Sequence, residues 1–312
     1  MEAAIGLVER ALADLASGRA SMPVRSVFVK PDRSGVVGLM PGFLESPAAF
    51  GLKAVTVFPG NATRGIDSHQ GAVLLLEPAT GRPEALLEGG EITAIRTAAV
   101  SAAATRALAR EDAAVLGVLG SGVQGRAHVE AIRLVRRIAR VKMWSRSAAA
   151  ARKAAESVGA EPVATAREAV EGADIVVTAT AAREPVLERP WVADGTHINA
   201  VGACIPVARE IDSATVAASK LFVDSRDAAF VESGDVLFPI REGVVGESHV
   251  RAEIGAVLAG LRPGRESRSE ITLFKSLGLA VEDLAVGAYV LERARRENRG
   301  SVVAFAGDPG EA

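Results

Sequence analysis

The sequence predicts an α/β protein, with a doubly wound parallel sheet that follows an antiparallel sheet or open barrel. Short strand-like runs joined by turns fill the first hundred residues, and buried strands alternate with helices from about residue 93. A glycine-rich loop, GSGVQG at residues 120–125, directly follows one of these buried strands. At 312 residues the chain is too long for one ordinary hydrophobic core, so we expect two domains.

An amphipathic helix is expected to open the chain and to end at Gly18, because apolar residues recur there at helical spacing. These residues are Ile5, Leu7, Val8, Ala11, Leu12 and Leu15. Strand-like runs follow at residues 25–30, 35–42, 52–61 and 72–89, and a Pro, Thr and Gly cluster breaks the last one. Strands that follow one another in this way pair antiparallel, as an open sheet or barrel.

The sequence pattern changes after residue 90, from successive short strands to alternating helices and buried strands. The stretch EITAIRTAAVSAAATRALAR at 91–110 is rich in alanine and suits a closely packed helix. Buried strands are expected at residues 113–120, 140–145, 173–180, 196–203 and 220–225, with the spacing of parallel strands joined by crossover helices. Residues 281–298 form a further helical stretch, and the final GDPGEA is expected to be a loose tail.

Composition and charge exclude several classes of protein. The formal net charge is -2 and acids and bases are interspersed, which argues against nucleic acid or an anionic membrane as a partner. Cys204 is the single cysteine, so no internal disulfide and no cysteine-based zinc site is expected, and no metal is predicted. No apolar run approaches the roughly 20 residues that span a bilayer, and the N-terminus does not resemble a signal peptide. We expect a cytoplasmic protein with a small-molecule partner.

The glycine-rich loop has the order of a dinucleotide site, which is a buried strand, a tight turn and a helix. Gly120 permits the turn, Gly122 lets the backbone approach a pyrophosphate, and Gly125 lets the helix pack on the strand. Val123 and Gln124 begin the helix, whose unpaired amides can bind phosphate. A GxGxxG pattern is weak by itself, but this context predicts a dinucleotide cofactor.

The end of the next strand favours NADP(H). Where NAD is preferred, an Asp or Glu about 20 residues beyond the glycines accepts hydrogen bonds from the ribose hydroxyls. Ser145, Arg146 and Ser147 occupy this region here. A carboxylate would repel a 2'-phosphate, whereas a guanidinium and two hydroxyls would bind it. NADP(H) is therefore the preferred cofactor, and NAD(H) stays an alternative.

Several separated stretches carry a resemblance that extends from about residue 20 to residue 290. They are MPVR, LMPG, LKAVTVFPGN, DSHQGAVLLLEPATG, EITAIRTAAVSA, GSGVQG, HINAVGA, VDSRDAA, ESGDV and LFKSLGLAVEDLA, in this order. Together they resemble the ornithine cyclodeaminase and mu-crystallin family. The more similar branch is that of mu-crystallin, whose members are NADPH-dependent ketimine reductases.

The resemblance implies a homodimer with a Rossmann domain inserted in a discontinuous α+β domain. Residues 1–96 and 285–312 would form the substrate-binding and dimerisation domain, and residues 97–284 the Rossmann domain. By position, Arg25, Lys53 and Arg96 match the family's basic triad around the substrate carboxylate, and Met40 and Cys204 fall in the same substrate site. An Arg offers a planar fork for a carboxylate, and a nearby Lys can also pass a proton to nitrogen, so Lys53 is the expected catalytic residue.

Other positions match the family's cofactor site. Arg96 is expected to contact the cofactor as well as the substrate. The remaining matches are Ser68 and His69 from the first domain, Thr178 and Thr180 at a strand end, Val201 behind the nicotinamide ring, and Ser276 across the pocket. A Ser next to a His in a turn is often only structural. Three acids near the later strands, Asp224, Glu232 and Asp235, are interpreted first as loop and cap residues and second as proton donors.

Two departures from the cyclodeaminase branch favour reduction over deamination. That branch has an acid two positions before the Met of its LMP stretch and an Asp after the segment that matches residues 201–203. Gly38 and Cys204 stand at these positions, and neither binds an ammonium group or acts as that acid. The distal cation of ornithine would be left unpaired in a closed pocket, which is unfavourable.

The resemblance and these departures predict an NADPH-dependent reductase of cyclic ketimine carboxylates, such as pyrroline- or piperideine-2-carboxylate. The carboxylate would bind Arg25, Lys53 and Arg96, and Lys53 or an ordered water would protonate the nitrogen. The alternatives are an amino acid oxidoreductase similar to alanine dehydrogenase, ornithine cyclodeaminase itself, and a carrier without catalysis that resembles mu-crystallin. The intact basic triad argues against a pure carrier.

Overall fold

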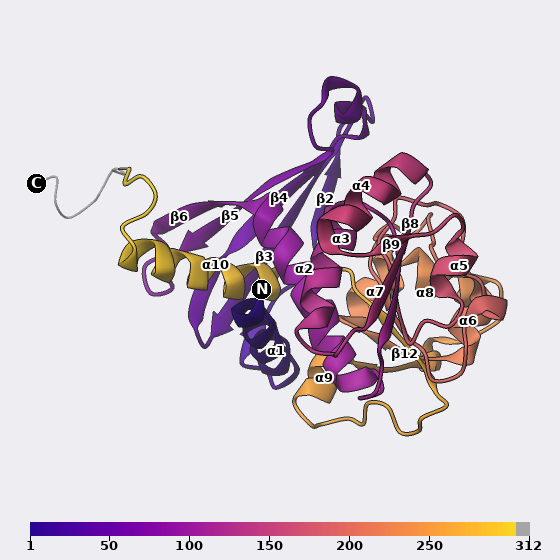
Figure 1. Cartoon of the computed structure of the whole chain (residues 1–312). Coiled ribbons are helices and arrows are strands. Elements are labelled where there is room, and N and C mark those ends of the chain that lie inside the picture. Colours follow the sequence, from indigo (N-terminus) through magenta and orange to yellow (C-terminus); the bar gives the residue numbers. More distant parts are fainter. Residues whose placement is uncertain (304–312) are drawn as a thin grey trace, which may run out of the picture. The chain divides into compact units, whose positions relative to one another are not determined.

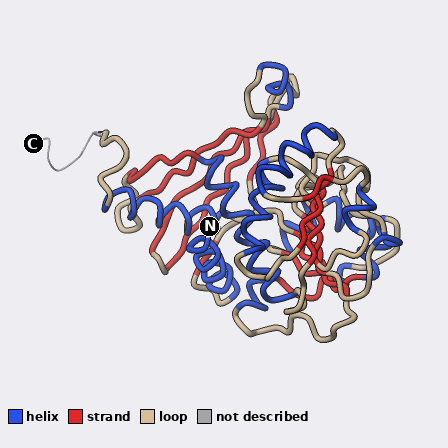
Figure 2. Tube along the Cα trace, in the orientation of Figure 1, coloured by secondary structure: helices blue, strands red, loops and turns tan. Residues whose placement is uncertain are grey.

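The computed structural model describes residues 1–303, without the side chain of residue 62, and the predicted GDPGEA tail lies outside the described residues. Contacts within the chain divide it into two compact units. Unit 1 comprises residues 1–18 and 93–279, and unit 2 comprises residues 19–92 and those from residue 280 onward. The strands, red in Figure 2, accordingly form two separate sheets.

Unit 1 contains a parallel sheet of eight strands in the order β13, β12, β14, β11, β10, β7, β8, β9. Its strands are β7 (Val115–Leu119), β8 (Arg140–Trp144), β9 (Glu161–Pro162), β10 (Ile175–Thr178), β11 (His197–Ala200), β12 (Ser219–Val223), β13 (Val250–Glu253) and β14 (Ile271–Lys275). The chain runs from β7 outward to β8 and β9, then returns to β10 on the other side of β7. Doubly wound sheets bind ligands where the strand order reverses, at the carboxyl ends of the strands. The predicted Rossmann-type sheet is confirmed, with its reversal between β7 and β10.

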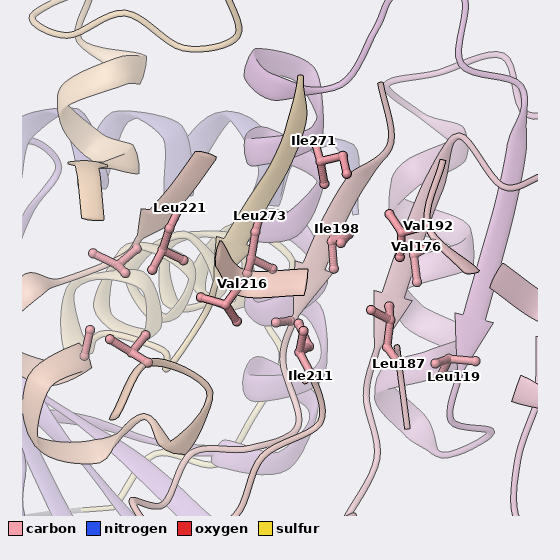
Figure 3. Packing of buried hydrophobic residues seen from close by; sticks show 14 of the residues in the cluster. Leu119, Val176, Leu187, Val192, Ile198, Ile211, Val216, Leu221, Ile271 and Leu273 are labelled. Carbon is pink, nitrogen blue, oxygen red and sulfur yellow. The ribbon is translucent and has the colours of Figure 1, made fainter. Parts of the chain in front are cut away.

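Helices cover both faces of this sheet, as strands with two apolar faces require. On one face, Val176, Ile198 and Leu221 of the strands pack with Leu187 and Ile211 of the connecting segments (Figure 3). On the other face, residues of β7, β8 and β10 pack against α3 and α4. The helices are α1 (Glu2–Ala16), α2 (Gly89–Leu108), α3 (Val123–Arg133), α4 (Ala148–Val158), α5 (Ala166–Val170), α6 (Ser213–Ala218), α7 (Arg226–Glu232), α8 (Gly234–Arg241) and α9 (Ile254–Leu258), with short 3-10 helices at Arg189–Trp191 and Glu247–His249. None of the helices within residues 1–303 is long and apolar enough to cross a membrane.

The first helix groups with unit 1, whereas the sequence placed all of residues 1–96 in the other domain. Helix α1 packs against α9, where Gly255 approaches the backbone so closely that a Cβ would lie 2.3 Å from Leu12 O. The apolar spacing of α1 predicts a buried face but does not identify the partner that buries it. The two units divide near residues 92 and 280, and the domain boundaries after residues 96 and 284 stay a prediction.

Unit 2 is built on an open antiparallel sheet in the order β1, β3, β4, β5, β6, with β2 also paired to β3. The strands are β1 (Ala20–Ser21), β2 (Ser26–Val29), β3 (Val36–Glu45), β4 (Ala48–Val57), β5 (His69–Leu76) and β6 (Pro83–Glu88), and a 3-10 helix spans Pro59–Arg64. Helix α10 (Ala280–Arg296) lies across β3, β4 and β5, as Figure 1 shows. The predicted antiparallel sheet is therefore present, completed by a helix from the C-terminal part of the chain.

Helix α10 approaches one face of this sheet closely. A Cβ at Gly42 of β3 would lie 3.1 Å from Ala280 Cβ and 3.2 Å from Leu284 Cδ1. Burial alternates along β3 and β4, so Met40 and Lys53 lie on this covered face, and they are opposite each other in the antiparallel register. A charged side chain from β4 is thus enclosed between sheet and helix.

Candidate active site

The glycine-rich loop after β7 has the geometry of a phosphate cradle. Gly120 has φ +122°, and a Cβ there would lie 2.2 Å from Ala179 O in the loop after β10. A Cβ at Gly125 would lie 2.1 Å from Gly120 O, so α3 starts directly on the loop. At Gly122, by contrast, a Cβ would have no heavy atom within 4 Å, and no side chain caps α3. Open space at an uncapped helix N-terminus fits a dinucleotide pyrophosphate.

The segment after β8 carries no carboxylate. Ser147 is the N-cap of α4, where its Oγ accepts a hydrogen bond of 3.3 Å from Ala150 N. Ser145 Oγ in turn accepts one of 3.3 Å from Ser147 N. Arg146, between them, is exposed at the start of this helix. The hydroxyls therefore shape the turn, and the guanidinium extends from it.

Glu210, which the sequence analysis did not identify, lies at the carboxyl ends of β10 and β11 and is fully buried. Its Oε1 accepts hydrogen bonds from Thr180 N (2.6 Å) and Thr180 Oγ1 (2.7 Å). Its Oε2 accepts from Thr178 Oγ1 (2.9 Å) and Gly202 N (2.7 Å). The hydroxyls of the two predicted threonines are therefore bound to a carboxylate. No local sequence motif indicates Glu210 as a site residue, because its hydrogen-bond partners are not adjacent to it in the sequence.

A buried ion pair adjoins Glu210. Lys275 Nζ, at the end of β14, lies 3.0 Å from Asp235 Oδ2, and the two side chains are 0% and 1% exposed. Burial works to lower the pKa of Lys275, but Asp235, Cys204 and Glu210 outweigh it and the pKa is raised. The pKa of Glu210 is raised too, first by burial and then by Asp235. Lys275 is thus a fixed cation between acidic neighbours.

The loop after β14 is tied to β12 by Asp224. Asp224 Oδ2 accepts hydrogen bonds from Leu277 N and, at 2.7 Å, from Gly278 N, so this acid holds loop backbone. Gly278 has φ +82°, and Arg96 Nη1 lies 2.2 Å from the place of a Cβ there. Arg96 is 5% exposed. Glycine suits position 278 because of this positive φ, and it leaves room for the Arg96 guanidinium where it lies.

Two small residues lie beside these loops. Ser276 is 1% exposed, and its Oγ has no hydrogen-bond partner within the described part of the chain. Cys204 Sγ donates a weak hydrogen bond of 3.3 Å to Val201 O. A buried hydroxyl without a partner is unfavourable unless a ligand supplies one. Ser276 therefore fits its predicted place beside a cofactor.

In unit 2, Lys53 lies on the sheet face that α10 covers. Lys53 Nζ is 3.1 Å from Asp283 Oδ1 and 3.4 Å from Asp283 Oδ2. Ser68 Oγ lies 2.9 Å from His69 Nδ1, and the pKa of His69 is lowered, first by partial loss of solvent and then by the Lys53 ammonium. Arg25 is half-buried and immediately precedes β2. Asp283 is a further residue that sequence reasoning missed.

Within unit 1, the strand ends bring most predicted cofactor residues into one row. The loops after β7, β10, β11 and β14 carry Gly120, Thr180, Val201 and Ser276, and these strands are neighbours in the sheet. Within unit 2, Lys53 and Met40 are cross-strand neighbours. Arg96 belongs to unit 1, and its convergence with Arg25 and Lys53 stays a prediction. Among residues 1–303, no three His, Cys, Asp or Glu residues are grouped to hold a metal ion.

The family model of the ornithine cyclodeaminase/mu-crystallin family matches residues 1–298. The chain belongs to this family. The family predicted from separated motifs is thereby confirmed over nearly the whole chain, which includes both units.

Relatives within this family include reductases and dehydrogenases. The ketimine reductase mu-crystallin of Mus musculus is 40% identical, over 91% of this chain and 90% of the relative. The Δ1-pyrroline-2-carboxylate reductase of Thermococcus litoralis, solved with NADH and L-proline, is 42% identical with a TM-score of 0.93, over 96% of this chain and 95% of that one. An archaeal alanine dehydrogenase dimer with bound NAD is 37% identical with a TM-score of 0.92, over 98% and 95% of the two chains.

Proposed function

We propose that this protein reduces cyclic ketimine carboxylates to cyclic amino acids with a nicotinamide dinucleotide. The observation that carries the proposal is its similarity, over 96% of the chain, to a reductase whose structure contains both NADH and L-proline. L-Proline is the cyclic amino acid that results when the C=N bond of a pyrroline carboxylate is reduced. The mouse relative, a ketimine reductase by name, supports the same class of reaction.

The basic residues have distinct proposed roles. Arg25, Lys53 and Arg96 bind the substrate carboxylate, and Met40 and Cys204 line the same site. A bound nicotinamide supplies hydride to the imine carbon. Asp283 holds the Lys53 ammonium in place at 3.1 Å, and Lys53 supplies a proton to the imine nitrogen.

The absence of two acids supports reduction over cyclodeamination. Gly38 lies in β3 on the face that α10 covers, where a Cβ would already be 3.3 Å from Val55 Cγ1. Cys204 contributes a thiol that donates to Val201 O. Neither residue offers a carboxylate to the second amine of ornithine, and burial of an unpaired ammonium is costly.

We propose NADPH as the preferred cofactor. The turn after β8 presents Arg146 at the N-terminus of α4, with Ser145 and Ser147 on either side of it. A 2'-phosphate bound there would meet a guanidinium, hydroxyls and the positive end of a helix. The Thermococcus litoralis reductase was solved with NADH, so NADH is the comparison that tests this preference.

We also propose a homodimer that forms through the second face of the unit 2 sheet. The face opposite Lys53 bears large exposed apolar side chains, and the archaeal alanine dehydrogenase is a dimer. These side chains include Phe28 (64% exposed), Leu39 (44%), Phe50 (38%) and Leu86 (73%). An apolar patch of this kind on a sheet marks an interface.

Turnover by the purified protein tests the proposal. NADPH or NADH oxidation would be followed with pyrroline-2-carboxylate, piperideine-2-carboxylate, pyruvate with ammonia, and, in the oxidative direction, ornithine with NAD. Oxidation of NADPH by the two cyclic imines is expected. Turnover confined to ornithine, with release of ammonia, would overturn it.

Alanine dehydrogenase activity is the second candidate, because the archaeal alanine dehydrogenase covers as much of the fold at 37% identity. An open-chain imine formed from pyruvate and ammonia presents the same carboxylate and C=N bond as a cyclic ketimine. The two substrates therefore differ in ring closure and in their need for free ammonia. A kcat/KM for pyruvate with ammonia above that for either cyclic imine would assign this second function.

A further inference from the structure

Three neighbouring strands of the unit 1 sheet, β10, β11 and β14, end in a network of buried charges. Glu210, Asp235 and Lys275 are 0%, 1% and 0% exposed. Glu210 lies in the segment between β11 and α6, Asp235 lies in the first turn of α8, and Lys275 ends β14. Burial of three ionisable groups is costly unless hydrogen bonds and opposite charges offset it. The burial of these three groups together at the carboxyl ends of the strands therefore calls for a physical role.

The network fixes two loops against each other. Each oxygen of Glu210 accepts one backbone N–H and one hydroxyl, with Thr180 on one side and Gly202 and Thr178 on the other. The loops are so close that a Cβ at Gly202 would lie 2.2 Å from Thr180 O and 2.6 Å from Glu210 Oε1. No side chain fits between the loops, and the carboxylate spans both of them.

Asp235 and Lys275 hold Glu210 in this position. Asp235 Oδ1 accepts hydrogen bonds from Glu210 N (2.7 Å) and Ile211 N (3.1 Å), and its other oxygen is paired with Lys275. The lysine belongs to β14, which pairs directly with β11. A connected path of contacts therefore runs from β14 through α8 to the loops after β10 and β11.

We propose that Glu210 is a positioning residue. It fixes the two loops that line the nicotinamide end of the dinucleotide site. Glu210 fixes residues 180 and 202, which follow the carboxyl ends of β10 and β11, and β10 is the neighbour of β7, whose glycine-rich loop lies at the same end of the sheet. Asp235 and Lys275 fix Glu210 in turn. The inference rests on the proposed function for its link to hydride transfer, because a small displacement of a reacting group greatly slows that step.

Glu210→Gln tests this role without a change of size. An amide has one oxygen and one NH2 group, so in either orientation the NH2 faces a backbone N–H, of Thr180 or of Gly202. One loop must therefore be released. Asp212→Asn is the matched control, because Asp212 also accepts two backbone N–H groups, but from Thr215 (2.9 Å) and Arg189 (3.2 Å) and not from Thr180 or Gly202.

Three measurements on these variants are decisive. In the ligand-free protein, amide hydrogen exchange at residues 180 and 202 is expected to be about tenfold faster in Glu210→Gln than in Asp212→Asn. The NADPH dissociation constant is expected to stay within about threefold, because the pyrophosphate loop is untouched, while kcat falls by about 10- to 100-fold. Wild-type exchange at both amides, or equal losses of kcat in the two variants, would overturn the inference.

A second variant covers the case in which Glu210→Gln does not fold. Thr180→Val keeps the shape of the side chain and removes one of the four donors to Glu210. Faster exchange at the amide of residue 180 is expected, and unchanged exchange would overturn the inference. Exchange in the ligand-free protein does not depend on the substrate. A protein that reduces no ketimine yet shows the expected exchange would therefore refute the proposed function and leave the positioning role in place.

Discussion

The Lys53 ammonium lies 3.1 Å from Asp283 Oδ1, in an ion pair that joins β4 to α10, with side chains 3% and 0% exposed. The pair is far apart in sequence, and it encloses the cation between an antiparallel sheet and the helix that covers it. A buried Lys held in this way has a fixed position, which suits the transfer of a proton from its Nζ to a bound substrate.

Replacement of this lysine is expected to affect folding and catalysis separately. Lys53→Met should cost about 3 to 5 kcal/mol of unfolding free energy, because it removes the cation beside a buried carboxylate. The double variant Lys53→Met with Asp283→Leu should regain that stability yet remain about 100-fold or more below wild-type turnover. Urea unfolding and imine reduction measure the two effects. Full turnover in the stable double variant would exclude Lys53 from catalysis.

The cofactor preference is expected to depend on Arg146. Arg146→Ala should raise the KM for NADPH by about 10- to 100-fold, because charge-assisted hydrogen bonds to a phosphate are lost, and should leave the KM for NADH nearly unchanged. Arg152→Ala is the control, since Arg152 is an exposed arginine of the same helix. Steady-state kinetics with both cofactors decide the matter. Equal changes in the KM values for NADPH and NADH would show that Arg146 does not bind the 2'-phosphate.

Acid is expected to destabilise unit 1 through two buried histidines. Burial lowers the pKa of His128 to about 4 and that of His197 to about 3, from 6.5. Below pH 6.5 the unfolded chain therefore binds protons that the folded chain does not. Stability should fall as the pH falls from 6.5 toward 4, by about 1.4 kcal/mol per pH unit for each histidine.

Urea unfolding at pH 7 and pH 5 checks this slope. Trp144 and Trp191, the two tryptophans of the chain, both belong to unit 1 and report on its unfolding by fluorescence. His128→Gln should lower stability at pH 7, because His128 contacts Gln124 O (2.7 Å) and Ser101 Oγ (2.9 Å). It should also reduce the pH slope. An unaltered slope would show that His128 is protonated in the folded chain.

The proposed dimer is expected to depend on the exposed face of the unit 2 sheet. Leu86→Glu places a charge where an apolar partner surface would bury it, and should convert dimer to monomer in light scattering. Leu261→Glu, at a leucine of unit 1 that is 60% exposed, is the matched control. A Leu86→Glu protein that keeps the mass of the dimer would place the interface elsewhere.

The parts of the fold that local chemistry dictates could be predicted from the sequence. The strand ending at Leu119, the glycine-rich loop and the helix after it follow from apolar runs, glycine and helical spacing over a few residues. β14 was not predicted, because ITLFK is a short apolar run with no turn signal on its own. The grouping of α1 with unit 1 depends on the close approach of Gly255 to Leu12. The spacing of apolar residues in α1 does not indicate this contact.

The same distinction separates the predicted site residues from those missed. Arg25, Lys53 and Arg96 lie in stretches that resemble a family, so their positions could be transferred. Glu210 and Asp283 are single acids within ordinary segments, and their partners lie 8 to 32 and 230 residues away, respectively. Only the folded chain brings such pairs together.

Transfer of an isotope label tests the central claim most directly. The protein would be incubated with NADPH that carries deuterium on the transferred position of the nicotinamide, together with pyrroline-2-carboxylate, and the product examined by NMR. We expect proline with deuterium at its α-carbon. Proline without the label, or no proline at all, would contradict hydride transfer to a ketimine carbon.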